Sequence, residues 1–219
     1  MKVLAIFGAG GQGIEILELA KNVNKCEKRW DDFVFINNGD PADDIYGVKV
    51  MGLDEALLKY KGQLEGVLAV GEPTLRDKIA KEMDDNGIPG AIIVHPAVAI
   101  PDSSTLGAGT CVFPGAYVST NSTVGRNVMI SVNAVIGHDA VIEDNVILSV
   151  ASFVAGMVHV GKNAYIGGGA QVKESINIGE NSVVAIGSVV FRDVAAGDMV
   201  LGNPARATKR SSDRLFHGQ

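Results

Sequence analysis

Cysteine and long apolar runs are both scarce in this sequence of 219 residues. The two cysteines, Cys26 and Cys111, lie far apart in unrelated contexts. This argues against a disulfide framework or a zinc site and favours a reducing compartment. No stretch approaches the ~20 apolar residues that a bilayer-spanning helix needs. The N-terminal apolar run is too short for a signal peptide, so we expect a cytoplasmic protein without membrane insertion.

Positive charge is also in deficit. Lysine and arginine total 19 against 25 aspartates and glutamates, which gives a formal net charge of −6. Nucleic acids and anionic membranes are therefore unsuited as main partners, because they are themselves negatively charged. Aromatic residues make up only 5% of the chain, whereas glycine occurs 27 times. This composition indicates tight, repeated turns.

The C-terminal half carries a strict six-residue repeat. Every sixth position from Val94 to Val190 is Val, Ile or Leu, seventeen positions in all. The residue four places after each of them is always Ala, Ser, Thr, Val or Ile. The residue directly after them is often glycine, as at Gly107, Gly125, Gly137, Gly161, Gly167 and Gly179. A period of six matches neither an α-helix nor a simple alternating strand.

Such a repeat is typical of a chain that turns a corner every six residues and points one aliphatic side chain inward from each flat side. Three hexapeptides then close an 18-residue triangular coil, and successive coils stack as parallel strands ~4.8 Å apart. Asn127, Asn145, Asn163 and Asn181 suit corners that need a positive φ. We therefore predict a left-handed parallel β-helix over residues 91–201 and a C-terminal tail over 202–219.

Residues 1–90 alternate between strand and helix patterns. We expect strands at Lys2–Phe7, Phe33–Ile36 and Gly66–Val70, and helices at Ile14–Asn24, Leu53–Lys61 and Thr74–Asn86. Thr74 is the expected N-cap of the last helix, and Gly87 is its expected stop. This alternation predicts an α/β domain with a small Rossmann-like parallel sheet.

The first strand leads into a glycine loop, GAGGQG, of the form G-x-G-x-x-G. Between a strand and a helix, the backbone N–H groups of such a loop can hold phosphates. A nicotinamide site would need an acid after the second strand, where this chain has amides instead. A purely structural turn remains an alternative, but a mononucleotide or nucleotide-sugar site is favoured. Its candidate residues are Gly8, Gly10, Gly11, Gln12, Gly13, Asn37 and Asn38.

One histidine has a setting that suits proton transfer. His138 follows Ile136-Gly137 at an expected corner of the prism, and Asp139 comes directly after it. A carboxylate that accepts from one ring nitrogen leaves the other free to act as a general base. Gly156 lies eighteen residues further on, hence one coil away, where its N–H could donate to a thioester oxygen. The alternative is a solvated corner histidine without a catalytic role.

The other three histidines have weaker claims. We expect His95 to be structural or capping, His159 to face outward on the surface, and His217 to lie in the C-terminal tail. A zinc site between subunits, as in the γ-class carbonic anhydrases, needs three histidines with two of them closely spaced on one strand side. No pair in this chain has that spacing, so we expect no metal.

The motifs together resemble a known family. The GAGGQG loop, the His-Asp pair in an uninterrupted hexapeptide series, and the closing Gly202-Asn203-Pro204-Ala205-Arg206 are similar to those of the sialic acid O-acetyltransferase and nucleotide-4-aminosugar N-acetyltransferase family. The resemblance covers residues 1 to about 208. It implies a homotrimer that binds acetyl-CoA between adjacent β-helices and acetylates a sugar directly, without an acyl-enzyme.

The resemblance also implies roles for single residues. His138 would be the general base, Asp139 would orient it, and Gly156 would donate to the thioester carbonyl. The acceptor's nucleotide would lie over the glycine loop. This chain departs from the family at Gln12, where a histidine is common, at Asn37 and Asn38, where an aspartate pair is common, and at Ile147, where many members carry a second histidine.

Two surface features bear on partners. Apolar residues around the His138 coils, several of them expected to face outward, favour the trimer; they are Phe113, Tyr117, Met129, Val132, Ile147, Phe153 and Met157. Cationic candidates for the acetyl-CoA phosphates are Lys173, Arg192, Arg206, Lys209 and Arg210. The favoured function is N-acetylation of a nucleotide-linked 4-amino sugar. The alternatives are O-acetylation of a sugar or small molecule, and a non-catalytic nucleotide-sugar-binding scaffold.

Overall fold

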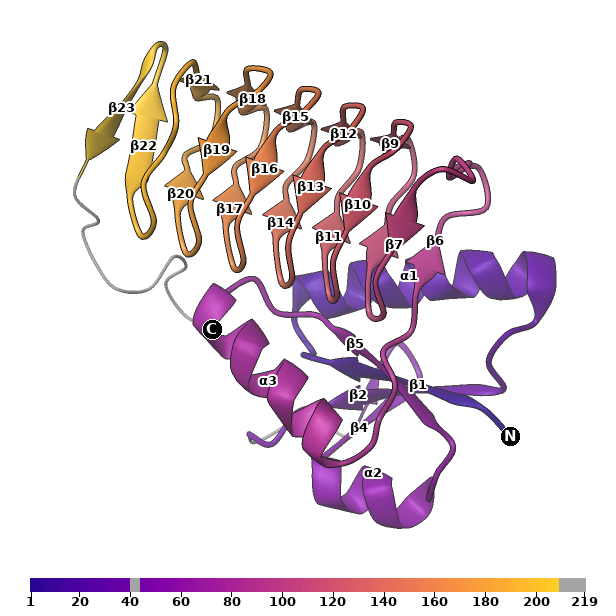
Figure 1. The fold of residues 1–219 in the computed structure, drawn as a ribbon. Helices are drawn as coiled ribbons and strands as arrows, with labels where there is room; N and C mark the ends of the chain where they lie inside the picture. Colours follow the sequence, from indigo (N-terminus) through magenta and orange to yellow (C-terminus); the bar gives the residue numbers. More distant parts are fainter. Residues whose placement is uncertain (40–43, 209–219) are drawn as a thin grey trace.

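The structure is a computed structural model, and it describes residues 1–39 and 44–208. An α/β unit at the N-terminus is followed by a triangular β-helix whose coils stack away from it (Figure 1). The predicted fold class, a small parallel sheet followed by a left-handed parallel β-helix, is confirmed.

The N-terminal unit is built around a five-stranded sheet in the order β3-β4-β2-β1-β5. Its elements are β1 (Val3–Phe7), α1 (Gly11–Glu27), β2 (Asp32–Ile36), β3 (Asp44–Ile45), β4 (Val48–Met51), α2 (Leu53–Lys59), β5 (Leu64–Leu68) and α3 (Pro73–Asp85). All neighbouring strands are parallel except β3 and β4. One face of the sheet packs against α1, and the other packs against α2 and α3.

Two details differ from the sequence prediction. Helix α1 begins at Gly11 rather than Ile14, because the second half of the glycine loop forms its first turn and Ile14 N already donates to Gly10 O at 3.1 Å. The expected N-cap Thr74 is wrong: Pro73 starts α3, since its fixed φ suits the first helical position, and Glu72 is the cap. Gly87 follows α3 with a φ of +64°, as expected of a stop.

The β-helix has three faces, each a sheet of short parallel strands, and the α1 face ends in an antiparallel pair. The β7 face consists of β7 (Thr105–Leu106), β10 (Thr123–Val124), β13 (Val141–Ile142), β16 (His159–Val160) and β19 (Asn177–Ile178). The β9 face consists of β9 (Tyr117–Val118), β12 (Val135–Ile136), β15 (Phe153–Val154), β18 (Gln171–Val172) and β21 (Val189–Val190). The α1 face consists of β6 (Ile93–Val94), β8 (Cys111–Val112), β11 (Met129–Ile130), β14 (Ile147–Leu148), β17 (Tyr165–Ile166), β20 (Val183–Val184), β22 (Met199–Gly202) and β23 (Ala205–Thr208).

Strands in successive coils pair eighteen residues apart, as in Val124 with Ile142 and Ile136 with Val154. The repeat aliphatics from Val112 to Val190 are all at most 2% exposed and fill the prism. Those before Val112 are only partly buried, because no complete coil covers the start of the prism. The four corner asparagines have φ between 55° and 60°, as predicted.

The last coil is shorter. Val184 pairs with Val200, sixteen residues later, and β22 then turns back on itself to pair antiparallel with β23. Residues 205–208 of the predicted C-terminal tail therefore belong to a sheet, where the hairpin covers the end of the α1 face. The rest of the tail, with Lys209, Arg210 and His217, lies outside the described residues.

Helix α1 lies between the N-terminal sheet and the β-helix. Its apolar residues form one cluster with β1 on one side and with Cys111 and Phe113 of the β-helix on the other. Helix α3 lies against the corner that joins the β7 face to the α1 face. There Arg126 bonds to Asp84 at 2.6 Å and Lys162 to Asp77 at 2.8 Å. The two parts are thus joined by an apolar helix and by ion pairs.

A ladder of asparagine side chains runs along that same corner. The Asn145 amide donates to Asn163 at 3.1 Å and to Asp77 at 3.0 Å, and it accepts from Asn127 at 3.3 Å. The Asn163 amide in turn donates to the Asn181 side-chain oxygen at 3.1 Å. Each asparagine of the ladder also has a positive φ, a backbone conformation that Asn tolerates better than most other non-glycine residues.

We expect Asn145→Ala to lower the free energy of unfolding by about 2–4 kcal/mol, because it removes three hydrogen bonds at a buried site and leaves Asp77 and Asn163 with fewer partners. Asn133→Ala is the matched control. Asn133 has the same left-handed backbone at an exposed corner, with no side-chain hydrogen bond to the described part of the chain. Urea titrations measure both. Equal losses would show that the ladder contributes nothing beyond backbone conformation.

Candidate active site

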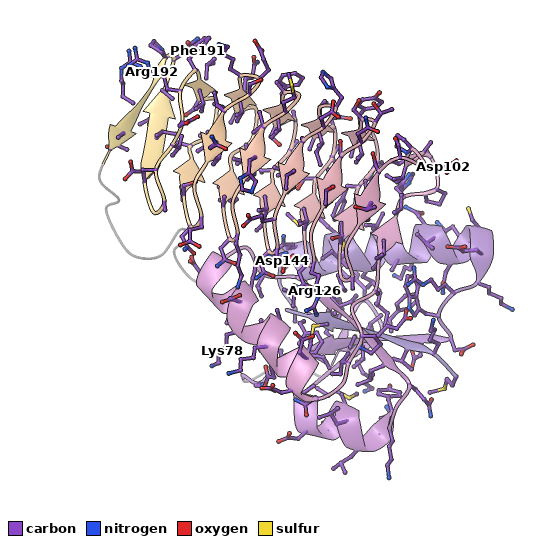
Figure 2. The ribbon with its side chains drawn as sticks, in the orientation of Figure 1. Lys78, Asp102, Arg126, Asp144, Phe191 and Arg192 are labelled. Carbon is purple, nitrogen blue, oxygen red and sulfur yellow. The ribbon has the colours of Figure 1, made fainter. Side chains whose placement is uncertain are left out.

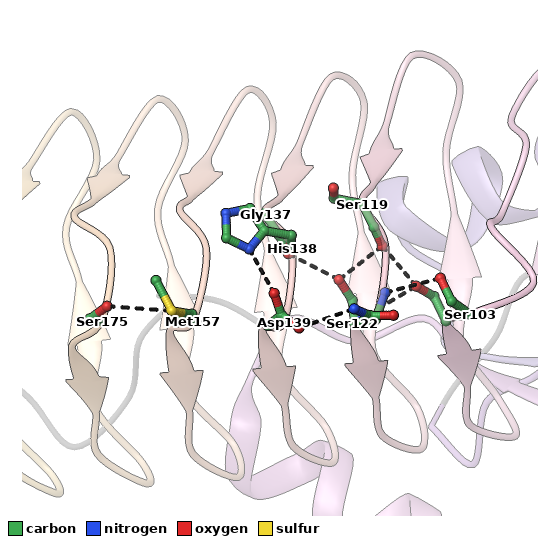
Figure 3. A network of polar contacts seen from close by, with 10 residues as sticks. Ser103, Ser119, Ser122, Gly137, His138, Asp139, Met157 and Ser175 are labelled. Atoms are coloured by element: carbon green, nitrogen blue, oxygen red, sulfur yellow. Dashed lines mark hydrogen bonds and ion pairs between the residues drawn. The ribbon is translucent and has the colours of Figure 1, made fainter.

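His138 and Asp139 sit at the corner that joins the β9 face to the β7 face. The His138 Nδ1 and Asp139 Oδ2 atoms are 2.7 Å apart, and the two side chains are 56% and 49% exposed. Figure 3 shows one ring nitrogen turned toward Asp139 and the other turned away from it. The imidazole therefore has one nitrogen anchored and one available to a ligand.

Asp139 occupies the corner position with positive φ, where several other coils carry Asn. Its other oxygen, Oδ1, accepts from the Asn121 amide at 3.2 Å, one coil earlier. The hydrogen bond from His138, supported by that from Asn121, holds the pKa of the Asp139 carboxyl below its usual range. The carboxylate is thus ionised at neutral pH. It keeps the proton of a neutral His138 on Nδ1 and leaves Nε2 as an acceptor.

Gly156 lies under the His138 ring, one coil further along, where the repeat predicts it. A Cβ on Gly156 would come within 2.6 Å of Nε2 and 2.7 Å of Cε1. Any other residue would therefore displace the imidazole. Gly156 is buried, and its N–H has no acceptor within the described part of the chain. Gly156 therefore offers an unpaired hydrogen-bond donor next to the His138 ring.

The cationic candidates lie further along the prism. Lys173 is exposed at the His138 corner, in the coil after Gly156. Arg192 and Arg206 line one cavity of about 240 Å³, together with Phe191, whose ring is 52% exposed. Figure 2 shows Phe191 and Arg192 at the end of the β-helix remote from the N-terminal unit. The three cations thus follow His138 toward the last coil.

The glycine loop contains two kinds of glycine. A Cβ on Gly13 would lie 2.2 Å from Gly8 O, and one on Gly8 would lie 2.5 Å from Ala69 O, so close packing requires both glycines. A Cβ on Gly10 or Gly11 would meet no atom of the described residues within 4 Å, and neither glycine has a positive φ. The chain itself therefore gives no reason for glycine at these two positions, and the space beside them is open to a ligand.

Asn37 and Asn38 follow β2 and line a cavity of about 280 Å³ with Gly8. This cavity lies at the carboxyl ends of β1, β2 and β5, where open α/β sheets bind ligands. The side-chain oxygen of Asn37 accepts from Gly39 N at 3.1 Å, and that of Asn38 accepts from Leu53 N at 3.0 Å. Both amides are thereby held in fixed orientations.

The structure does not bring the two groups of candidates together within one chain. Gln12 contacts Met129 on β11, at 2.6 Å between Nε2 and Sδ, which places the glycine loop beside the α1 face. His138 lies at the corner between the other two faces. A reaction that uses both groups needs a second chain to complete the site.

Comparison with known proteins identifies the family. A family model described as the PglD N-terminal domain matches residues 3–83. The structure of PerB from Caulobacter crescentus in complex with CoA and GDP-perosamine is 31% identical, with 95% of this chain and 98% of that chain covered and a TM-score of 0.85. The chain belongs to the hexapeptide-repeat sugar acetyltransferases.

Two other solved structures agree. A mutant of perosamine N-acetyltransferase from Caulobacter crescentus, in complex with CoA and GDP-perosamine, is 30% identical, with 96% and 98% of the two chains covered and a TM-score of 0.86. The acetyltransferase domain of PglB from Neisseria gonorrhoeae FA1090, in complex with acetyl coenzyme A, is 26% identical, with 94% and 99% covered and a TM-score of 0.87. A search of curated proteins finds no match.

Two other histidines of this sugar acetyltransferase, His95 and His159, have partners of their own. His159 faces outward on β16, as predicted, and its Nε2 is 2.8 Å from Glu143 Oε1. His95 caps its own turn, because its Nδ1 accepts from Ala97 N at 3.2 Å. Over residues 1–39 and 44–208, no group of three or more His, Cys, Asp or Glu side chains is arranged to hold a metal ion.

The apolar residues around the His138 coils fall into two sets. Tyr117, Phe153 and Met157 are exposed on or beside the β9 face, as predicted. Phe113 and Ile147 are buried, and Met129 and Val132 are partly buried against the α1 cluster. The prediction that several of the seven face outward is thus met by the first set, whereas the N-terminal unit lies over the first coils of the α1 face and covers Phe113, Met129 and Val132. No helix in the described ranges is long and apolar enough to cross a bilayer.

Two site residues were missed from the sequence. Asn121 precedes Asp139 by eighteen residues, so the coil period itself could have indicated their contact. Phe191 directly follows the last residue of the repeat series, but nothing in the sequence indicates that it shares a cavity with Arg206.

Proposed function

We propose that this enzyme transfers the acetyl group of acetyl-CoA to the amine of a nucleotide-linked 4-amino sugar. The observation that carries the proposal is the His138–Asp139 pair, whose ring packs on Gly156 at the start of a row of cations. The acceptor class is supported by two solved structures from Caulobacter crescentus, of nearly the same length, that contain CoA and GDP-perosamine.

When bound, acetyl-CoA supplies the acetyl group as a thioester. The acceptor amine first loses its extra proton to solvent. His138 Nε2 then takes the proton that the nitrogen releases as the C–N bond forms, and returns it to the sulfur as the C–S bond breaks. Asp139 holds the ring and stabilises its protonated form. The Gly156 N–H is the donor we propose for the carbonyl oxygen.

Transfer is direct in this proposal. An acyl-enzyme would need a nucleophile such as the buried thiol of Cys111, but burial raises the pKa of this thiol to about 12. The thiol therefore stays protonated and unreactive at neutral pH.

Lys173, Arg192 and Arg206 would bind the phosphates of acetyl-CoA, and the exposed Phe191 ring beside Arg192 offers a surface for its adenine. Both cysteines are unpaired, which fits the cytoplasm.

We also propose a homotrimer built on the β9 face. Tyr117 and Phe153 point outward from this face, and Met157 flanks it at the His138 corner. The β9 face separates the His138 corner from the α1 face, where the glycine loop lies. Three β9 faces around one axis would therefore set the His138 corner of each chain beside the glycine loop of the next. The trimer would thereby bring together the His138 corner and the glycine loop, which lie apart within one chain.

We expect Phe153→Asp to convert the trimer to monomers and to abolish turnover, because a buried unpaired carboxylate disfavours the interface. Leu58→Asp is the matched control, since Leu58 is an equally apolar and more exposed residue on α2, away from the β9 face. Analytical ultracentrifugation gives the mass of each variant. A trimer that survives Phe153→Asp would place the interface elsewhere.

The proposed activity is tested by thiol release from acetyl-CoA with UDP-, GDP- and CMP-linked amino and hydroxy sugars. Turnover of a 4-amino sugar would establish N-acetylation. Turnover of hydroxy sugars alone would establish O-acetylation. Binding of nucleotide sugars without any acetyl-CoA binding would contradict both N-acetylation and O-acetylation. It would favour a non-catalytic scaffold that binds nucleotide sugars.

A further inference from the structure

Arg76 is a buried cation near the start of α3, the helix that lies beside the β-helix in Figure 1. It is only 1% exposed, and none of the ion pairs within residues 1–39 and 44–208 includes it. Its Nε has no hydrogen-bond partner in those ranges. Burial lowers the pKa of its guanidinium to about 10, so the group is still charged at neutral pH. A buried charge without an opposite charge destabilises a fold, so stability alone does not account for Arg76.

The guanidinium of Arg76 bonds to two backbone carbonyls that belong to different parts of the chain. Nη1 donates to Val70 O at 2.9 Å, in the segment between β5 and α3. Nη2 donates to Asn127 O, at the corner that joins the β7 face to the α1 face. Because a guanidinium is planar and its N–H groups form a rigid fork, it holds the two carbonyls at one distance and one angle. The apolar packing of α1 on the β-helix has no such direction.

The segment between β5 and α3 packs directly on the glycine loop. A Cβ on Gly8 would lie 3.1 Å from Val70 Cγ1, so the two segments are in contact. At the other end of the loop, Gln12 contacts Met129 on β11, two residues after Asn127. One short stretch of the β-helix therefore holds the glycine loop from two sides, and one of these two links passes through the buried guanidinium.

We propose that Arg76 is a positioning residue for acetyl transfer, which fixes the N-terminal unit and its glycine loop at one place on the β-helix. This rests on the proposed function, in which the glycine loop of one chain serves the His138 corner of the next. The residues that line the acceptor cavity beside Gly8 all belong to the N-terminal unit, whereas His138 and Gly156 belong to the β-helix. Loss of the Arg76 link therefore leaves each binding site whole but misaligns the two. A misplacement of ~1 Å between reacting groups can lower a rate about 10²-fold.

Steady-state kinetics on Arg76→Met and Arg76→Gln tests the positioning role, with the number of CoA sites from calorimetry as the measure of folded enzyme. Met replaces the stem of Arg76 without its charge, and Gln keeps a donor for one carbonyl in case Arg76→Met does not fold. We expect kcat per folded site to fall by about tenfold to a hundredfold, while the Kd for CoA and the KM for the nucleotide sugar stay within about twofold of the wild type. Lys162→Gln is the matched control, because it removes an exposed link of 2.8 Å between α3 and the same corner. It should keep the wild-type kcat.

Three kinetic results would overturn the proposal: a wild-type kcat per folded site in the Arg76 variants, an equal loss in Lys162→Gln, or a change confined to KM. Crystal structures of the wild type and Arg76→Gln, superposed on the β-helix, test the placement without turnover. We expect the glycine loop of the variant to be displaced by ~1 Å or more, and an undisplaced loop refutes the role of Arg76 while acetyl transfer stands. A displaced loop, in an enzyme whose wild type acetylates no sugar, supports the placement by Arg76 and refutes the proposed function.

Discussion

His138→Ala should lower kcat by roughly 10²–10⁴ while acetyl-CoA binding changes little. The loss is that of a general base, because Nε2 is the ring atom left free when Nδ1 bonds to Asp139 at 2.7 Å. The ring's contact with Gly156 is also removed, but this leaves space rather than a clash. Stability should therefore change little at a side chain that is 56% exposed.

The matched control is His159→Ala. His159 has the same kind of carboxylate partner, Glu143 at 2.8 Å, and a similar exposure of 46%, but it lies on β16 of the β7 face, one coil further along. It should retain wild-type turnover. Thiol-release kinetics and calorimetry with CoA measure the two effects separately. Equal kcat in His138→Ala and the wild type would exclude His138 as the base and point to proton transfer through solvent.

Gly13→Ala should lower the stability of the fold, whereas Gly10→Ala should weaken substrate binding and leave stability unchanged. The new Cβ at Gly13 would lie 2.2 Å from Gly8 O, which forces α1 away from β1. We expect a loss of about 1–3 kcal/mol in the free energy of unfolding, with activity lost in proportion to the unfolded fraction. At Gly10 the Cβ meets nothing within 4 Å, so stability should stay within about 0.5 kcal/mol.

Gly10→Ala should nevertheless raise the KM for the nucleotide sugar several-fold, because the methyl group occupies space that the chain leaves open at the start of α1. Thermal unfolding and steady-state kinetics on both variants make the comparison. A Gly10→Ala enzyme with wild-type KM values for both substrates would show that the glycine loop only packs β1 against α1, which is the structural alternative.

The sequence by itself determined the β-helix and much of the corner that carries His138. A solenoid repeats one local geometry, so each residue contacts those one period away, and the period can be read directly. Counting eighteen residues from His138 placed Gly156 beneath its ring, and the same count backward from Asp139 reaches Asn121. The positive φ at Asp139 follows from the corner position, which Asn121 occupies in the preceding coil.

Only the tertiary structure decided what covers each face and which atoms point into the acceptor cavity. Helix α1 packs on the α1 face through residues about a hundred positions apart in the chain, so no local pattern marks Phe113 as buried and Phe153 as exposed. The orientation of Asn38 depends on Leu53 N, which a connecting segment brings beside it. Lys78 reaches the same cavity from α3. Such contacts depend on the packing of distant elements, which a residue pattern does not encode.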